Sequence, residues 1–376
     1  MKVSRVDRLK PSATLKISET AKKLKKKGKD VIDASVGEPD FNTPSHIIDA
    51  AINAMKSGKT KYVQTRGIPE LVDAIVEKYR KEGVEISQKN VIVTPGAKYA
   101  IFEAVMSTIE KGDEVILLDP SWVSFEACVL IAEGKVKWIP HAEGFHDAPL
   151  EEHITKNTRM IIINSPNNPL GVVYPKSFLN KVRDLVLDHN LILLSDEIYE
   201  KIVFEDKYQT MLKYEELHNN LIVVNGFSKT YAMTGWRLGF AVGPEDVISR
   251  MLKIQSHSVS HPTTFVQYAG VAALNGDQDC VRKMVSEFKK RRDILSEGLK
   301  NLELEFAPLE GAFYAFVNVK EDGLKFSERF LEEKLVATVP GIAFGRSYKN
   351  WIRISYAIST DKVKELLDRL EKFIGK

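Results

Sequence analysis

From about residue 45 to residue 275 the chain alternates between helical patterns and short apolar, β-branched runs, each followed by polar or glycine-rich residues. This alternation is typical of an α/β domain with a largely parallel sheet. The clearest runs span residues 91–93, 115–118, 160–163, 191–194 and 221–224. Because ligands of open α/β sheets bind outside the carboxyl ends of the strands, we expect the five segments that follow these runs to meet in one crevice.

The pattern changes near residue 275. A long helical stretch rich in Lys and Arg is followed by EGAFYAFVNV, VATVPG and WIRISYA, and the chain ends in an amphipathic helical pattern. Short strands among helices, separate from the parallel series, indicate a second and smaller α+β unit.

At the other end, residues 12–28 fit a helix that ends at Gly28, with Leu15, Ala21 and Leu24 facing inward and the lysines outward. We therefore predict an α/β fold with a mostly parallel central sheet, helices on both of its faces, and a smaller α+β domain. The predicted divisions are an N-terminal segment (1–44) that packs with the small domain, a large domain (45–275) and a small C-terminal domain (276–376).

Composition excludes several classes. Of the 376 residues 28% are charged, the net charge is only +3, and no apolar run approaches the roughly 18 residues of a membrane span. Cys128 and Cys280 lie far apart, and His257 and His261 have Pro262 beside them and no evident third ligand. We expect a cytoplasmic protein without a metal site, a nucleic-acid partner or membrane contact.

Lys229 is the strongest candidate for chemistry. The apolar run 221–224 stops at Asn225 and Gly226, and Lys229 follows in a small polar loop. A lysine in such a loop can be desolvated, which lowers its pKa and lets the amine attack a carbonyl; the alternative is an ordinary solvated lysine. Arg237, eight residues further on, offers a fixed cation for a phosphate.

Two other strand ends favour a ligand that carries both charges. Gly96 and Ala97 lead into a helix, and the free N–H groups of such a start suit a phosphate. Asp196 ends the almost wholly apolar run LILLSDE, so its carboxylate needs a cation, either within the protein or on the protonated nitrogen of a heterocycle.

Four further residues complete the candidate set. Tyr199 and Asn168 suit a phenolic oxygen, Trp122 offers a flat face for stacking or for simple core packing, and Arg353 suits either a carboxylate ligand or a surface ion pair. One ligand would use all these groups: an aromatic aldehyde with a phosphate, a ring nitrogen and a phenolic oxygen. That ligand is pyridoxal 5'-phosphate.

The motifs GEPDF, NSPNNP, SDEIY, SKTYAMTGWRLG, EGAFY and the arginine of WIRISYA, in this order, resemble the class I aminotransferases of fold type I. The resemblance spans nearly the whole chain and is closest to the prokaryotic aspartate aminotransferase subgroup. It implies ping-pong transfer of an amino group from an L-amino acid, with aspartate the best guess, to a 2-oxo acid, with 2-oxoglutarate the best guess. It also implies a homodimer with shared active sites.

The resemblance assigns roles residue by residue. It makes Lys229 the Schiff-base lysine and Asp196 the partner of the pyridinium, and it sets Asn168 and Tyr199 at the phenolic oxygen. The remaining implied contacts are Gly96, Ala97, Lys98, Ser228 and Arg237 for the phosphate, Tyr62 for the phosphate of the neighbouring subunit, and Gly37, Trp122, Asn168 and Arg353 for the substrate.

Two departures and several alternatives remain. Leu170 stands where relatives have a threonine, and Gly226 stands where many have a hydroxyl, which leaves open whether Ser228 replaces that phosphate contact. An aromatic or broad-specificity aminotransferase and a pyridoxal phosphate lyase of the same fold share nearly every motif. A nicotinamide dehydrogenase is disfavoured because the Gly-x-Gly-x-x-Gly turn after a first strand is absent.

Overall fold

The computed structural model describes residues 4–9, 13–205 and 208–375. Within them a seven-stranded sheet has the order β2-β8-β7-β6-β5-β3-β4, and β8 runs antiparallel to both of its neighbours while the other pairs are parallel. Its strands are β2 (Val91–Thr94), β3 (Glu114–Asp119), β4 (Lys135–Pro140), β5 (Thr158–Asn164), β6 (Ile192–Asp196), β7 (Leu221–Gly226) and β8 (Gly239–Val242).

Helices cover both faces of this sheet, which explains why its central strands are apolar throughout. Along β5, Met160 and Ile162 pack into one core while Ile161 and Ile163 pack into the other, because successive side chains point to opposite faces. The first core includes α4 (Ala97–Thr108), α5 (Val123–Ile131) and α7 (Glu245–Ser256), and the second includes α3 (Pro69–Lys81), α6 (Lys176–Asp188) and α8 (Thr264–Asn275). The predicted fold class is confirmed.

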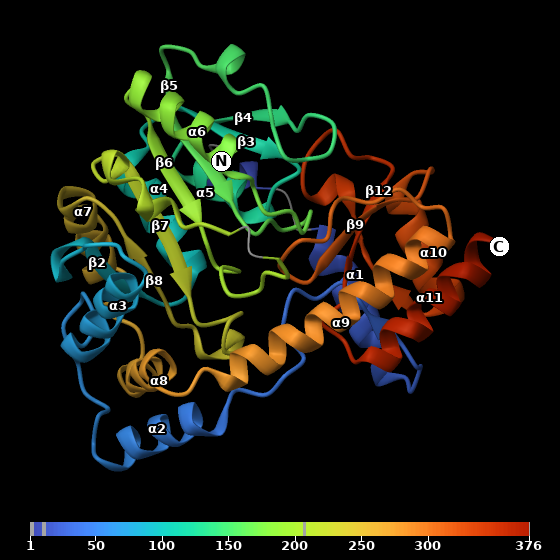
Figure 1. Ribbon diagram of the computed structural model, residues 1–376, viewed down its shortest axis with the longest axis horizontal. Coiled ribbons are helices and arrows are strands. Elements are labelled where there is room, and N and C mark those ends of the chain that lie inside the picture. Colours follow the sequence, from blue (N-terminus) through green and yellow to red (C-terminus); the bar gives the residue numbers. More distant parts are fainter. Residues whose placement is uncertain (1–3, 10–12, 206–207, 376) are drawn as a thin grey trace.

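Helix α2 (Ser45–Lys56) lies against α8 on the outside of this layer (Figure 1). Short 3-10 helices occur at η1 (Arg5–Arg8), η2 (Gln88–Asn90), η3 (Glu151–His153), η4 (Met211–Lys213), η5 (Glu215–Leu217), η6 (Thr234–Trp236) and η7 (Gly341–Ala343).

A separate antiparallel sheet forms the smaller part, with the order β11-β12-β9. Its strands are β9 (Tyr314–Asn318), β11 (Val339–Pro340) and β12 (Trp351–Ser355). Strands β9 and β12 pack with α9 (Asp279–Asn301), α10 (Gly323–Lys334) and α11 (Thr360–Ile374) around one core, whereas Val339 of β11 packs into a core of the large sheet. In Figure 1, α9 runs from the neighbourhood of α8 across to this sheet and so connects the two parts.

The beginning of the chain joins this smaller part. After α1 (Ala13–Lys26), β1 (Ile32–Asp33) pairs in parallel with β10 (Val336–Ala337). Ala21 is buried and Leu24 is half-buried, as expected, and Ile17 is buried too, whereas the side chain of Leu15 lies outside what the structure describes. The division at residues 44 and 275 stays a prediction.

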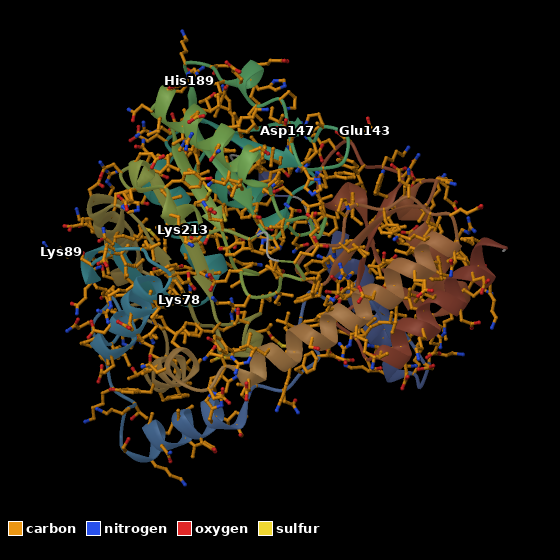
Figure 2. All side chains as sticks on the ribbon, viewed as in Figure 1. Lys78, Lys89, Glu143, Asp147, His189 and Lys213 are labelled. Carbon is orange, nitrogen blue, oxygen red and sulfur yellow. The ribbon has the colours of Figure 1, made fainter. Side chains whose placement is uncertain are left out.

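No helix in the described part of the chain is long and apolar enough to span a membrane. Polar side chains project from the outer surface of the large part, among them Lys89, Glu143 and His189, which Figure 2 labels at the rim.

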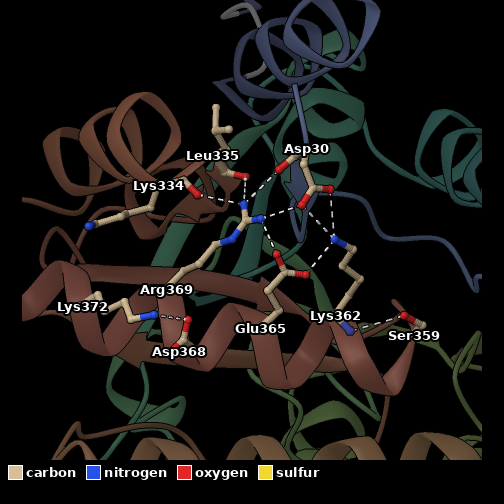
Figure 3. A network of polar contacts seen from close by, with 9 residues as sticks. All are labelled: Asp30, Lys334, Leu335, Ser359, Lys362, Glu365, Asp368, Arg369 and Lys372. Carbon is tan, nitrogen blue, oxygen red and sulfur yellow. Dashed lines mark hydrogen bonds and ion pairs between the residues drawn. The ribbon is translucent and has the colours of Figure 1, made fainter. Parts of the chain in front are cut away.

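A polar network fastens α11 to the segment between α1 and β1 (Figure 3). Nη1 of Arg369 donates to the carbonyl oxygens of Asp30 (2.9 Å) and Lys334 (3.0 Å), and Nη2 donates to Oδ2 of Asp30 (2.7 Å). Nζ of Lys362 reaches the same carboxylate at 3.0 Å. Only 17% of the Arg369 side chain is exposed, so its contacts are less screened than those of ordinary surface pairs.

We expect Arg369→Ala to lower the free energy of unfolding by about 1–2 kcal/mol, because several carbonyl and carboxylate acceptors lose their donor together. Lys372→Ala is the matched control, since it removes an exposed i,i+4 pair with Asp368 on the same helix and should cost less than about 0.5 kcal/mol. Urea unfolding of both variants measures the difference. Equal midpoints would show that the network around Arg369 adds nothing beyond a surface pair.

Candidate active site

A cavity of about 460 Å³ lies at the carboxyl ends of the parallel strands. All five predicted segments contribute to its wall, through Lys98 after β2, Trp122 after β3, Asn168 after β5, Asp196 at the end of β6 and Lys229 after β7. Because β8 is antiparallel, the segment that precedes it lies at the same edge of the sheet. That segment adds Arg237 to the lining.

Lys229 is partly buried, and its Nζ donates a hydrogen bond to the carbonyl oxygen of Gly37. Burial, followed by the positive charges of Arg353 and Arg237, lowers the pKa of Lys229 to about 8, against the opposing effects of Glu38 and Asp196. A larger fraction of this amine than of an ordinary lysine is therefore uncharged near neutral pH, which suits a nucleophile or a base.

Asp196 is 4% exposed, and its Oδ1 accepts the N–H of Ile198 at 3.1 Å. Burial, chiefly, raises its pKa to about 7. Its hydrogen-bond partner is this neutral N–H, and the salt bridge considered from the sequence is not among the ion pairs of the described residues. The carboxylate thus lines the cavity without a salt bridge, although the positive charge of Lys229 in the same lining opposes the rise of its pKa.

Arg353 is 5% exposed and lies between the rings of Tyr314 (4.5 Å to the centroid) and Phe344 (4.9 Å). Its Nη1 donates to Oδ1 of Asn168 (2.9 Å) and its Nη2 donates to the carbonyl oxygen of Ser35 (2.7 Å). Its Nε is buried with no partner among the described residues. Burial lowers the pKa of the guanidinium, which has only neutral acceptors around it.

A further cationic group, the Arg237 side chain, lies at the start of α4. Gly96 has φ +86°, and a Cβ at this position would lie 2.5 Å from Nη2 of Arg237, so a glycine is needed where the guanidinium crosses the turn. Arg237 is exposed and donates from Nη1 to the carbonyl oxygen of Thr234 at 2.9 Å. Ser228 lines the cavity, whereas Gly226 lies within β7 opposite Gly239 of β8.

The structure brings most of the predicted residues to this cavity. Those that line it are Gly37, Ala97, Lys98, Trp122, Asn168, Asp196, Tyr199, Ser228, Lys229, Arg237 and Arg353. Gly96 lies directly beneath Arg237. Tyr62 is not part of the lining: it is 90% exposed, and its ring lies 5.7 Å from that of His261.

Asn164 and Tyr314 are among the wall residues that sequence reasoning missed. Asn164 donates from Nδ2 to the carbonyl oxygen of Asp196 (2.9 Å) and accepts the N–H of Asn168 (2.8 Å), so it fixes both strand ends. The hydroxyl of Tyr314 lies 2.8 Å from that of Tyr199. Both had a signal, because Asn164 begins the motif NSPNNP and Tyr314 ends the motif EGAFY.

Comparison with known proteins identifies the family. Residues 29–370 match the family model described as aminotransferase class I and II. The chain belongs to this family.

Relatives and solved structures agree with this membership. The chain is 42% identical to a probable aspartate aminotransferase of Methanocaldococcus jannaschii, over 97% of each chain, and 42% identical to an aspartate aminotransferase of Pyrococcus horikoshii, over 98% of this chain and 96% of that one. The crystal structure of aspartate aminotransferase from Thermotoga maritima matches with a TM-score of 0.95 at 39% identity and covers 100% of both chains. The resemblance stated from the motifs is confirmed.

For this aminotransferase we expect the Lys229 amine, in the ligand-free protein, to react with acetic anhydride with a midpoint near pH 8 instead of the ordinary value of 10.5. Because the Asp196 carboxylate favours the charged ammonium, Asp196→Asn should move the midpoint to lower pH. Mass spectrometry of the peptide that contains Lys229 follows the labelling. A wild-type midpoint above pH 10 would contradict the assignment.

Proposed function

We propose that this protein transfers an amino group from an L-amino acid, with aspartate as the preferred donor, to a 2-oxo acid such as 2-oxoglutarate, and that pyridoxal 5'-phosphate is its cofactor. The observation that carries the proposal is one cavity that holds an amine with a pKa of about 8 together with a buried carboxylate and a buried guanidinium, neither of which forms a salt bridge with a described residue. The names of the relatives give the same activity for those proteins.

The residues of the cavity fit the cofactor. Asp196, which forms no salt bridge with a described residue, would pair with the ring nitrogen. Asn168 and Tyr199 would bond the phenolic oxygen, and Trp122 would stack on the ring. The glycine turn beneath the guanidinium supports a phosphate site built from Gly96, Ala97, Lys98, Ser228 and Arg237.

When bound, pyridoxal phosphate supplies an electrophilic aldehyde and an electron-withdrawing ring. Arg353 would bind the α-carboxylate of the amino acid through its fork of N–H groups, and Asn168 and the Ser35 carbonyl hold that fork in place. Lys229 would take the proton from the substrate Cα and pass it to the carbon of the cofactor that receives the amino group. In the second half of the reaction it would move a proton in the opposite direction, and its pKa of about 8 suits both tasks. Asp196, ionised, would hold a proton on the ring nitrogen.

A dicarboxylic donor is favoured by the excess of positive charge around the cavity. Its lining contains four cationic side chains, Lys98, Lys229, Arg237 and Arg353, and one carboxylate, Asp196, so the cavity suits ligands that carry several negative charges. The rings of Trp122, Tyr314 and Phe344, which also line the cavity, keep an aromatic or broad-specificity aminotransferase as the second candidate. For the lyase alternative, keto acid would be released without an added amino acceptor.

A homodimer with shared sites is part of the proposal. Ile48, Ile52 and Met55 share one face of α2, and each is 37–42% exposed. Tyr62, 90% exposed, follows that helix. An apolar stripe beside a free tyrosine supports a subunit contact through which Tyr62 reaches the phosphate of the other copy.

The cofactor assignment predicts that borohydride reduction of the purified yellow protein fixes the cofactor onto the peptide of Lys229. The reason is that the Lys229 amine follows β7, the neighbour of the β6 strand that ends at Asp196, and its pKa is lowered to about 8, whereas Lys98 is assigned to the phosphate. Lys229→Ala should abolish the adduct, whereas Lys98→Ala, which removes another lysine of the same wall, should leave it in place. An adduct on a different lysine in the wild type would refute the role of Lys229.

The substrate assignment predicts that Arg353→Lys lowers kcat/KM for all donors by a similar factor, on the order of 2–4 kcal/mol in transition-state stabilisation. Lysine keeps the charge but loses the bidentate geometry for the carboxylate that every amino acid carries. Aspartate, glutamate, phenylalanine and alanine, each with 2-oxoglutarate, form the panel, and the wild-type ranking tests the preference for aspartate. A loss confined to the acidic donors would mean that Arg353 binds the side chain.

A further inference from the structure

A buried carboxylate outside the proposed catalytic set joins the two walls of the cavity. Asp119 ends β3, three residues before Trp122, and is 1% exposed. Its Oδ2 accepts the N–H groups of Arg346 and Ser347, each at 3.0 Å, and the Ser347 hydroxyl at 2.8 Å. These donors belong to residues 344–347, which we name the latch loop and which lie between η7 and β12. Asp119 therefore bonds the large sheet to the smaller one.

The fit between the two segments is close. A Cβ on Gly345 would lie 1.7 Å from Oδ1 of Asp119, so the carboxylate reaches the backbone of the loop only because position 345 is a glycine. The N–H of Ser121 donates to the carbonyl oxygen of Phe344 at 2.7 Å and adds a second bond across the same contact. The Arg346 side chain is 70% exposed and lies 3.6 Å from Glu126, so the partner of Asp119 is the loop backbone and not this guanidinium.

The large-sheet side of the contact is held firmly. Nδ1 of His141 lies 2.8 Å from the carbonyl oxygen of Asp119, and its Nε2 lies 2.9 Å from the hydroxyl of Tyr174. Burial lowers the pKa of His141 to about 4, so the ring is neutral at physiological pH. One neutral tautomer satisfies both bonds, with Nδ1–H donating to the carbonyl and Nε2 accepting from the tyrosine.

The latch loop leads directly to the guanidinium. It begins at Phe344, whose ring lies 4.9 Å from Cζ of Arg353, and it continues into β12, which carries Arg353. On the other side of the contact, Asp119 is followed by Trp122 in the opposite wall. Any movement of the loop away from Asp119 would therefore shift Arg353 relative to Trp122 and Lys229.

We propose that Asp119 is a positioning residue, which holds the Arg353 wall at the distance from the Lys229 wall that a bound amino acid requires. The inference rests on the proposed function in one respect, the binding of the α-carboxylate by Arg353. Its expected effect lies in the binding of carboxylate ligands, since neither Asp119 nor the latch loop up to residue 347 carries a proposed cofactor contact.

The test uses the holoenzyme and Asp119→Asn, which places an amide near N–H donors that need an acceptor. Hydrogen exchange of the peptide that spans residues 341–351 should become faster. The Kd values of succinate and 3-phenylpropanoate, measured by calorimetry, should both rise about tenfold, while the cofactor absorbance stays unchanged. Glu126→Gln removes only the exposed pair with Arg346 and should match the wild type in all three readouts.

Gly345→Ala disrupts the same contact from the side of the loop. This second variant keeps the proposal testable if Asp119→Asn fails to fold. It should give the same changes, and the double variant should be no worse than either single one, because both remove one interaction. Faster exchange with unchanged Kd values would overturn the positioning role and leave a purely structural contact. Raised Kd values with unchanged hydrogen exchange would refute the proposal that Asp119 acts by holding the latch loop in place. A wild type that binds neither carboxylate would instead refute the role of Arg353, and the inference would fall with it.

Discussion

The structure depends on three buried or half-buried charged groups that form no salt bridge with a described residue. Asp196, Lys229 and Arg353 face one cavity, yet their contacts within the described chain are neutral: the N–H of Ile198, the carbonyl oxygens of Gly37 and Ser35, and the amide of Asn168. Taking a charge out of water costs several kcal/mol, and neutral hydrogen bonds offset only part of that cost. The same cost of burial raises the pKa of the carboxylate and lowers the pKa of the amine, because burial disfavours the charged form of each group.

The apolar sheet makes this arrangement tolerable. Strands β5, β6 and β7 are buried along almost their whole length, and the carboxyl end of each carries a polar residue, Asn164, Asp196 and Asn225. The charges therefore sit at the rim of a large core whose packing exceeds their destabilisation. A ligand with a cationic ring nitrogen and anionic groups would meet each charge with its complement, so binding removes a penalty already present in the folded chain.

Much of this could be predicted from the sequence, because a polar residue after a β-branched run leaves a strong local signal. Two strands of the large sheet were not predicted, each for a local reason. Strand β4 is a half-exposed edge strand with Lys135 and Lys137 among its apolar residues, and β8 is only four residues long and begins with Gly239. The direction of Arg353 could not be predicted either. Alternation in WIRISYA implies one exposed face, but β12 lies between β9 and β11 and is buried on both sides.

Contacts made by the backbone were beyond sequence reasoning altogether. The loop partners of Asp119 include backbone N–H groups, which every residue except proline carries, so the amino-acid sequence does not distinguish them. The same holds for the carbonyl oxygens that accept from Lys229 and Arg353. Such contacts depend on the path of the chain, and only the assembled fold reveals them.

The path of the chain has one more consequence. The Ser35 carbonyl and the Arg353 guanidinium, which share one hydrogen bond, are 318 positions apart, and the Gly37 carbonyl and the Lys229 amine are 192 apart. Such contacts close late, after the loop between them has lost its conformational freedom. During synthesis the carboxylate pocket cannot form until β12 has emerged and paired. A chain that ends before residue 353 therefore lacks the guanidinium for the substrate carboxylate, even when its large sheet has formed. Affinity for a simple carboxylate is thus a test of whether the whole molecule has been built.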